Sequence, residues 1–273
     1  MSPLVPRGAL RDSARSFLIE RGPTEADALA RVVFGLPRVE PFLADRLLVT
    51  LLGSDPGFER RGSRWNLSPP FAAASRPLHA IPFVVVDVET TGGRPPGDRI
   101  IEIAAVRTRG GRIEGEWSSL VDPGRPIPWV VARLTGIADR VVVGAPSFGE
   151  VADDFVDFLG SAPFVAHNAH FDWRFVNAEL LRSRGGCLVN ARLCTVRLAR
   201  RLLPHARRRN LDALAHLFGF EIPDRHRALG DARATARLLA RLLDLAAERG
   251  IEDETALAGL FGGDGTLWPE RPY

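Results

Sequence analysis

The sequence predicts an α/β protein in which a three-layer domain of mixed β-sheet and helices follows a small helical domain. Three observations predict this fold class. After residue 81, apolar strand-like segments alternate with helices that are apolar on one face. The first strands of this region follow one another closely, as in an antiparallel meander, and the helices come later. Residues 9–65 contain helical patterns and a single hairpin instead.

The composition is typical of a globular protein without a disulfide framework. Hydrophobic residues make up 45% and charged residues 25% of the 273 residues, which excludes a disordered or collagen-like chain. The two cysteines, Cys187 and Cys194, are too few for a disulfide framework or a zinc site. No run approaches the ~20 apolar residues of a membrane span, and the first residues lack the pattern of a secretory signal. We therefore expect a cytoplasmic protein with no membrane partner.

Positive charge is concentrated in the first part of the chain. All 36 basic residues are arginine. Residues 1–80 hold 11 arginines and 8 acids, a net charge of +3, whereas residues 81–273 hold 25 of each. This excess favours a polyanionic partner for the first part of the chain.

Residues 1–68 are predicted to form a small helical module that ends in a hairpin. The three helices and then the hairpin are expected at residues 9–20, 24–33, 42–52 and 55–65. Thr24 is the expected N-cap of the second helix, and Phe58 and Trp65 are expected to face inward from the hairpin. Three helices followed by a hairpin resemble a winged-helix module, with the hairpin as its wing.

Several functions are open for this module. Its wing carries Arg60, Arg61 and Arg64, which suit contact with a duplex backbone. The alternatives are a protein-docking module or a solvated turn. The third helix carries a wide apolar stripe that begins at Phe42 and Leu43.

Three short segments are set apart from the predicted domains. Residues 69–81 are rich in proline and alanine and are predicted to be a linker. Residues 251–273 are predicted to be a weakly structured C-terminal tail. Residues 4–8, Leu-Val-Pro-Arg-Gly, match a protease-cleavage linker and are left out of the fold prediction.

The main predicted domain spans residues 82–250. Its strands are expected at residues 82–89, 100–107, 111–121 and 164–166, and its helices at residues 147–159, 171–181, 210–218 and 230–249. The first strand is apolar up to Val86, which is typical of a buried strand. Ser147 and Glu150 have the spacing of a capping box at the start of the first helix.

Two acids, Asp87 and Glu89, end the apolar strand 82–89. Residues i and i+2 of a strand point to the same side, so the two carboxylates share one face. Like charges this close repel each other, and burial raises the cost. The chain contains no lysine, and no arginine lies within the motif, so a divalent cation is the natural partner. Oxygen ligands favour Mg²⁺ or Mn²⁺, and the alternative is a solvated acidic pair.

Two further segments place polar residues at the starts of helices. After a short apolar strand, Asn168 can cap the next helix and Asp172 lies in its first turn. His226 lies on a loop, and Asp231 opens the last helix. Taken singly, these residues have ordinary explanations: capping, an exposed histidine and an acid that favours the helix dipole.

Together the three segments resemble the DEDDh family of 3′–5′ exonucleases. The motifs are Asp87-x-Glu89-Thr90, Asn168-x-x-Phe171-Asp172 and His226-x-x-x-x-Asp231. The resemblance covers roughly residues 82–247 and is closest to the proofreading, epsilon-type subunits and domains of bacterial replicative polymerases. It implies a ribonuclease-H-like fold, with a mixed sheet between two layers of helices.

The resemblance implies a site that hydrolyses phosphodiester bonds with two divalent metal ions, Mg²⁺ or Mn²⁺. Asp87 would bridge the two ions, Glu89 and Asp231 would complete one site, and Asp172 would support the other. His226 would take the proton from the attacking water, a role that suits histidine, whose ordinary pKa is about 6.5.

The resemblance also implies contacts to the substrate strand. The residues concerned are Thr90, Thr91, Gly92, Leu134, Thr135, Asn168 and Phe171. The expected substrate is the single-stranded or frayed 3′ end of DNA, in proofreading or repair, with a DNA polymerase as a candidate partner and no organic cofactor. Two alternatives stay open: an RNA 3′ exonuclease, and a nucleic-acid- or polymerase-binding module with secondary nuclease activity.

Other polar residues near the motifs have structural explanations. We expect His167 and His170 to be structural or surface residues, and Trp173 to lie in the core. The last helix is expected to carry three arginines on its solvent-exposed face, Arg233, Arg237 and Arg241. Their expected ion-pair partners are Asp244 and Glu248, further along the same helix.

Overall fold

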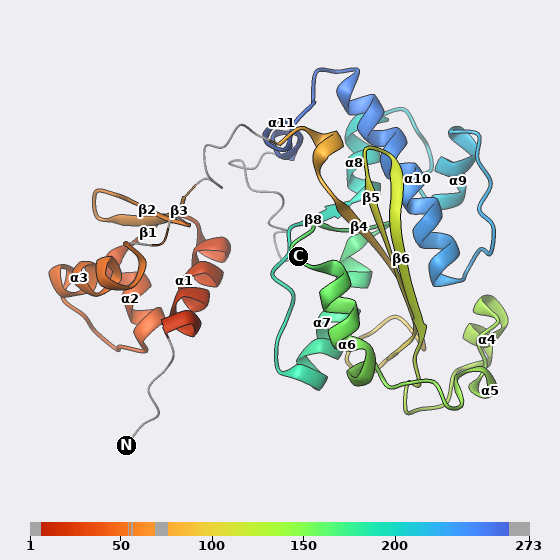
Figure 1. The fold of residues 1–273 in the computed structure, drawn as a ribbon, viewed down its shortest axis with the longest axis horizontal. Coiled ribbons are helices and arrows are strands. Elements are labelled where there is room, and N and C mark those ends of the chain that lie inside the picture. Colours follow the sequence, from red (N-terminus) through yellow and green to blue (C-terminus); the bar gives the residue numbers. More distant parts are fainter. Residues whose placement is uncertain (1–6, 54, 56, 69–75, 262–273) are drawn as a thin grey trace. The chain divides into compact units, whose positions relative to one another are not determined.

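The computed structural model describes residues 7–53, 55, 57–68 and 76–261 (Figure 1). Two compact units divide the chain near residue 75, and each is described by itself. Within the described residues, no helix has the length and apolar character needed to cross a membrane.

The first unit packs three helices on a small sheet. Its elements follow the order α1 (Arg7–Arg21), β1 (Thr24–Glu25), α2 (Ala26–Phe34), α3 (Pro41–Leu52), β2 (Phe58–Arg61) and β3 (Arg64–Leu67). The strands form an antiparallel sheet in the order β1-β3-β2. Phe58 and Trp65 are buried in its core, as predicted. Gly62 makes the turn of the hairpin with a left-handed φ of 63°.

One expectation for the first unit is wrong, and one apolar helix face is exposed. Thr24 is not an N-cap, because it pairs with Trp65 in the sheet, and α2 begins only at Ala26. The apolar stripe of α3 is not buried across its width, since Phe42 is 76% and Leu43 is 51% exposed. The helix turns its other face to the core, and that face consists of Ala44, Leu48, Leu51 and Leu52.

The second unit is built on a five-stranded mixed sheet. Its strands are β4 (Phe83–Thr90), β5 (Ile100–Arg109), β6 (Arg112–Leu120), β7 (Phe164–Ala166) and β8 (Arg192–Cys194). They lie in the order β6-β5-β4-β7-β8. The first three are antiparallel, as predicted, whereas β7 runs parallel to β4 and β8 parallel to β7. The strand that carries Asp87 and Glu89 is therefore the central strand.

Helices cover both faces of this sheet (Figure 1). One layer contains α6 (Phe148–Leu159) and α7 (Ala169–Arg184), and the other contains α8 (Thr195–Leu202), α9 (Leu211–Leu217) and α10 (Ala228–Ala247). Val84, Val86 and Val88 of β4 pack into the core with α6 and α7. Since side chains alternate along a strand, Asp87 and Glu89 point toward the layer of α10.

Several elements were not predicted from the sequence. Helices α4 (Trp129–Thr135) and α5 (Asp139–Val142) lie between β6 and α6, and β8 and α8 follow α7. The residues of α4 and α5 pack around Ile101 of β5. These pieces have three to eight residues each, too few for a hydrophobic period to stand out.

Parts of the expected linker and tail belong to the second unit. The 3₁₀-helix η1 (Leu78–Ala80) and helix α11 (Glu254–Gly259) lie in these segments. They are joined by an Arg76–Glu254 ion pair at 3.0 Å and by a hydrogen bond of 2.8 Å from the Leu78 N–H to the Glu252 carbonyl. Residues 69–75, 262–273 and the first part of the expected cleavage linker lie outside the described residues.

Candidate active site

The end of β4 carries the first two predicted site residues. Glu89 lies opposite Glu102 of β5, and the pairing shifts directly after it. Burial raises the pKa of Asp87 well above its ordinary value, and the nearby charges of Asp172, Asp231 and Glu89 raise it further. Burial, followed by the charge of Asp231, raises the pKa of Glu89 to about 7. The site therefore gathers carboxylates that repel one another.

Asp172 reaches this strand from the first turn of α7. Its Oδ1 accepts a hydrogen bond of 3.2 Å from the Val88 N–H, and only 4% of Asp172 is exposed. Burial raises its pKa to about 8. Asn168 stands at the N-cap position with a left-handed φ of 75°, but its side chain makes no capping hydrogen bond, contrary to prediction.

Asp231 and His226 complete the group from the other layer of helices. The ligand atoms of Glu89, His226 and Asp231 all lie within 4.8 Å of one another. The His226 N–H donates to Asp231 Oδ2 at 3.3 Å. The other oxygen of Asp231 is buried without a hydrogen-bond partner among the described residues. Burial is also the main cause that raises the pKa of Asp231.

The loop before α10 holds His226 in an unusual backbone conformation. Asp224 and His226 both have left-handed φ angles, 53° and 63°, which cost about 1–2 kcal/mol each in side-chain-bearing residues. Gly230 makes this loop possible, because a Cβ there would lie 2.4 Å from the Asp224 carbonyl oxygen. The chain bends tightly enough to bring His226 back over Asp231.

These side chains fit a divalent cation. Four carboxylates of raised pKa share the site, and one carboxylate oxygen of Asp231 is left without a partner by the described residues. Carboxylate oxygens suit Mg²⁺ or Mn²⁺, and the imidazole of His226 lies beside them. The predicted acids and His226 therefore come together from β4, α7, the loop before α10 and the first turn of α10.

Glu102 is a site-building residue that the sequence analysis missed. It is 5% exposed and accepts hydrogen bonds from Arg227 at 2.6 Å and from the Ala228 N–H at 2.8 Å. It thereby fixes the first turn of α10, which carries Asp231. A lone acid in the apolar strand 100–106 was the feature that would have identified it.

Arg225 and Asp212 were also missed. Arg225 donates to Asp212 Oδ1 at 2.8 Å and to Asp212 Oδ2 at 3.2 Å. It also pairs with Asp231. A guanidinium thus enters the acidic site from the residue next to His226.

The loop after β4 is stabilised by hydrogen bonds from the side chains at its start. Thr90 and Thr91 are 8% and 2% exposed. The Thr90 hydroxyl donates to the Gly92 carbonyl at 2.6 Å, and the Thr91 hydroxyl accepts from the Arg99 N–H at 3.0 Å. A Cβ on Gly92 would lie 2.5 Å from a carboxylate oxygen of Asp98. Of these predicted substrate contacts, the two threonine hydroxyls are used within the loop.

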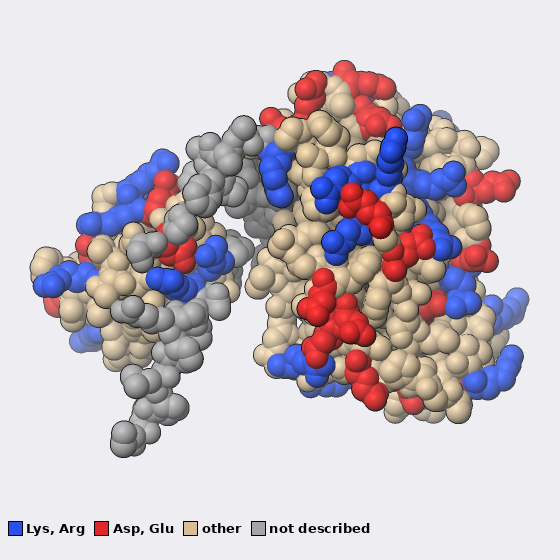
Figure 2. Space-filling model, viewed as in Figure 1, with Lys and Arg blue, Asp and Glu red and all other residues tan. Residues whose placement is uncertain are grey.

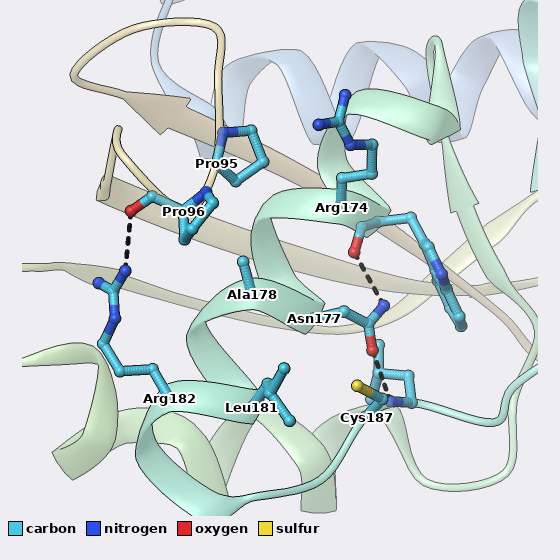
Figure 3. A pocket seen from close by; sticks show the side chains of 10 residues that line it. Pro95, Pro96, Arg174, Asn177, Ala178, Leu181, Arg182 and Cys187 are labelled. Atoms are coloured by element: carbon cyan, nitrogen blue, oxygen red, sulfur yellow. Dashed lines mark hydrogen bonds between the residues drawn. The ribbon is translucent and has the colours of Figure 1, made fainter.

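This loop is fastened to α7. Arg99 donates to both carboxylate oxygens of the buried Glu179, at 2.6 and 2.9 Å. Arg182 donates to the Pro96 carbonyl at 2.8 Å, beside a groove of about 580 Å³ between the loop and α7 (Figure 3). These contacts fix the loop relative to the helix that carries Asp172.

The remaining predicted substrate contacts differ in exposure. Leu134 of α4 is 55% exposed, whereas Thr135 is buried and its hydroxyl donates to the Val131 carbonyl at 3.0 Å. Phe171 is partly buried and packs on Phe175, with 4.8 Å between the ring centroids.

Other predictions near the site have mixed outcomes. His167 is a structural residue, since its Nδ1 lies 2.8 Å from the Thr195 hydroxyl and burial lowers its pKa to about 4. His170 is exposed, and Trp173 packs edge-on against Phe164 of the core. Arg241 pairs with Asp244 of its own helix at 3.5 Å, as predicted, whereas Arg233 pairs with Glu116 of β6 at 2.5 Å.

Comparison with known proteins identifies the family. Residues 84–239 match the family model of RNase T type that is described as Exonuclease. The chain belongs to this exonuclease family. The match confirms the prediction of a 3′–5′ exonuclease, and exonucleases of the DEDDh family depend on divalent metals.

Two curated relatives cover the same region. The chain is 40% identical over 162 residues to DNA polymerase III subunit epsilon of Aquifex aeolicus (strain VF5), which is 59% of this chain and 80% of the relative. It is 37% identical over 206 residues to DNA polymerase III PolC-type of Bacillus subtilis (strain 168), which is 74% of this chain but only 14% of the relative.

Solved exonuclease structures share the fold. Exonuclease X is 30% identical, with a TM-score of 0.53 over 65% of this chain and 98% of that one. The nuclease domain of 3′hExo, a DEDDh family member, is 20% identical, with a TM-score of 0.55 over 62% of this chain and 94% of that one. The predicted ribonuclease-H-like fold is confirmed.

Proposed function

We propose that this exonuclease removes nucleotides from the 3′ end of a DNA strand, with Asp87, Glu89, Asp172 and Asp231 holding two Mg²⁺ or Mn²⁺ ions and His226 acting as general base. The observation that carries the proposal is the convergence of these side chains from β4, α7, α10 and the loop before α10. The ligand atoms of three of them lie within 4.8 Å of one another. Perturbed carboxyl groups that share a cluster are typical of a functional site.

Each residue has a role that its position supports. When bound, the two ions supply a nucleophilic water and stabilise the charge that develops on the leaving oxygen. Asp87, on the central strand, is the acid whose pKa the three other carboxylates all raise, so it lies where a single side chain would help to hold both ions. His226 takes the proton of the attacking water, a contribution typically worth ~10²–10⁴-fold in rate.

The substrate strand contacts the exposed side of this site. Leu134, Asn168 and Phe171 are accessible enough to touch the terminal nucleotides, and Gly92 shapes the loop beside them by leaving room for the Asp98 carboxylate. Thr90, Thr91 and Thr135 act on the substrate by shaping the backbone beneath it. Exonuclease X, at 30% identity, was solved with 5′ overhanging duplex DNA, which favours DNA over the RNA alternative.

A polymerase is the proposed partner, in proofreading. Relatives named as polymerase III subunits support this, and the chain spans most of one of them but a small part of the other. We also infer that the first unit is a winged-helix-like module that docks on protein. Its wing arginines are already paired with acids, for example Arg60 with Asp45 at 2.9 Å, and α3 leaves Phe42 exposed.

The test follows 5′-labelled single-stranded DNA and a matched RNA oligomer with Mg²⁺ or Mn²⁺. We expect a ladder that shortens from the 3′ end, that is faster on DNA, and that disappears in EDTA and in Asp87→Ala. His226→Ala should lower the rate ~10²–10⁴-fold, whereas His216→Ala, an exposed histidine of α9, should not. A faster RNA ladder would overturn the DNA assignment, and full activity of Asp87→Ala would overturn the site.

A further inference from the structure

Arg225 is a cation placed inside the acidic site. One side of its guanidinium donates to both oxygens of Asp212, at 2.8 and 3.2 Å, and Nη1 pairs with Asp231 Oδ2. The side chain is 31% exposed, and the Asp231 side chain is only 5% exposed. The guanidinium thus joins an acid of the site to an acid outside the group of proposed metal ligands.

The three residues sit on three different parts of the second unit. Asp212 belongs to α9, Asp231 to α10, and Arg225 to the loop between these helices. The next residue in this loop is His226, which has a left-handed backbone conformation. An ion pair at both ends of Arg225 therefore also restrains the loop that positions the proposed base.

Arg225 and a divalent cation would compete for the negative charge of Asp231. Nη1 contacts Oδ2, the same oxygen that accepts the His226 backbone N–H, whereas Oδ1 has no partner among the described residues, so Arg225 and the metal compete through their charges and not for one oxygen. A doubly charged ion at this carboxylate repels a guanidinium in contact with it. Arg225 can give up Asp231 without becoming unpaired, because its other side stays on Asp212.

We propose that Arg225 is a built-in counter-cation and a positioning residue. It holds Asp231 and the His226 loop in place while the metal is absent, and it yields Asp231 to the metal while it keeps Asp212. This inference rests on the proposed function, since it takes Asp231 as a metal ligand. It adds that the positive charge of Arg225 balances Asp231 when no metal ion does so.

The experiment measures Mn²⁺ binding to the full chain by calorimetry and by electron paramagnetic resonance of free Mn²⁺. Removing the competitor in Arg225→Gln should tighten Mn²⁺ binding roughly two- to fivefold, as expected for the loss of one ion pair. Removing the anchor in Asp212→Asn should weaken it, because displaced Arg225 then has no partner. Arg225→Lys should lie close to the wild type. Arg233→Gln, which removes one charge from a surface pair of α10, is the matched control.

The opposite signs of the two variants distinguish competition from simple support. If Arg225 only stabilised the fold, both variants would shift Mn²⁺ affinity in the same direction. Equal or weaker binding by Arg225→Gln overturns the proposal. If Asp87→Ala binds Mn²⁺ as well as the wild type, the metal site itself is wrong and this inference falls with it; tight wild-type binding with equal Arg225→Gln binding overturns the inference alone.

In EDTA, the melting temperature gives a second readout. Arg225→Gln should melt below the wild type, and saturating Mn²⁺ should remove most of that difference because the metal replaces the lost cation. A difference that persists unchanged in saturating Mn²⁺ would contradict the role of Arg225 as a stand-in for the metal charge.

Discussion

The two units of this protein differ in where their charged side chains lie and in how these side chains are paired. In the first unit, arginines of the hairpin pair with acids on the surface, such as Arg60 with Asp45 at 2.9 Å and Arg64 with Glu25 at 2.7 Å. In the second unit, Asp87 and three further carboxylates share a partly buried site that Arg225 enters as a counter-charge. Both units also carry mixed acidic and basic side chains on the face seen in Figure 2.

The difference shows where charge has a function beyond solubility. Exposed ion pairs contribute about 0–1 kcal/mol each to the free energy of unfolding. Removing the surface pairs of the first unit should therefore change its stability little. Buried carboxylates that repel one another destabilise the fold, and they persist where catalysis or binding requires them. The second unit keeps this arrangement because the side chains around it are fixed by contacts that span the whole domain.

Among the residues that support the site, the largest effect is expected from Glu102, which holds one of these contacts. Glu102→Ala leaves the Ala228 N–H without its partner, so α10 and Asp231 lose their fixed position. Removing such a supporting residue typically costs 10–100-fold in metal affinity or activity, and we expect a loss of this size in the initial rate. Leaving the buried Ala228 N–H without its acceptor also destabilises the fold by about 1–3 kcal/mol, which thermal unfolding measures.

Glu116→Ala is the matched control for this prediction. Glu116 also joins the sheet to α10, through Arg233, but the pair lies on the surface, with side chains 30% and 46% exposed. It should change stability by about 0–1 kcal/mol and leave the rate unaltered. Equal effects of the two variants would show that burial does not separate these two contacts.

The acids of the candidate site were predicted through the resemblance to the DEDDh family, and local geometry supports that prediction. The alternation of a strand places Asp87 and Glu89 on one face, and the start of α10 places Asp231. The same local rules predicted the strands and the longer helices of the second unit. The short elements α4, α5 and β8 were not predicted, because packing around residues such as Ile101 determines them. Their sequences are too short to show a hydrophobic period.

The supporting residues could not be predicted, because their partners lie far away in the chain. Glu102 contacts Arg227 and Ala228, which are separated from it by 125 and 126 positions. Nothing around Arg225 in the sequence indicates that it bridges Asp212 and Asp231. Such pairs depend on how β5, α9 and α10 meet, which only the folded structure determines.

The second prediction concerns pH and the acids of the site. Burial raises the pKa of Glu89 to about 7 and of Asp172 to about 8, whereas unfolded carboxyl groups titrate near ~4. Between these values the folded state binds more protons than the unfolded state. The free energy of unfolding of the metal-free enzyme should therefore fall as the pH rises toward 8.5.

Thermal unfolding in EDTA at pH 5.5, 7.0 and 8.5 measures this slope. Each kcal/mol lost lowers the melting temperature by about 2–4 °C in a chain of this size. Asp87→Asn, which removes one repelling charge, should flatten the slope, and saturating Mn²⁺ should abolish it. A metal-free enzyme that becomes more stable toward pH 8.5 would show that these carboxylates are not held with raised pKa values.

The smallest effect is expected from the arginines of the first unit. Changing Arg60, Arg61 and Arg64 together to glutamine should leave the affinity of the full chain for a DNA duplex, and its salt dependence, within about twofold. These guanidinium groups already face Asp45, Glu59 and Glu25, so they release few counterions when they approach phosphates.

The same variant also distinguishes the two hypotheses for this unit. If the hairpin grips a duplex, the triple change should reduce the slope of log affinity against log salt by up to ~3, one for each phosphate that an arginine neutralises in the wild type. If the unit docks on protein, the triple change should leave the slope of log affinity against log salt unaltered. Phe42→Ser, on the exposed face of α3, should then weaken binding to a polymerase without changing the nuclease rate. The paired charges of the hairpin and the exposed apolar side chains of α3 both favour the second outcome.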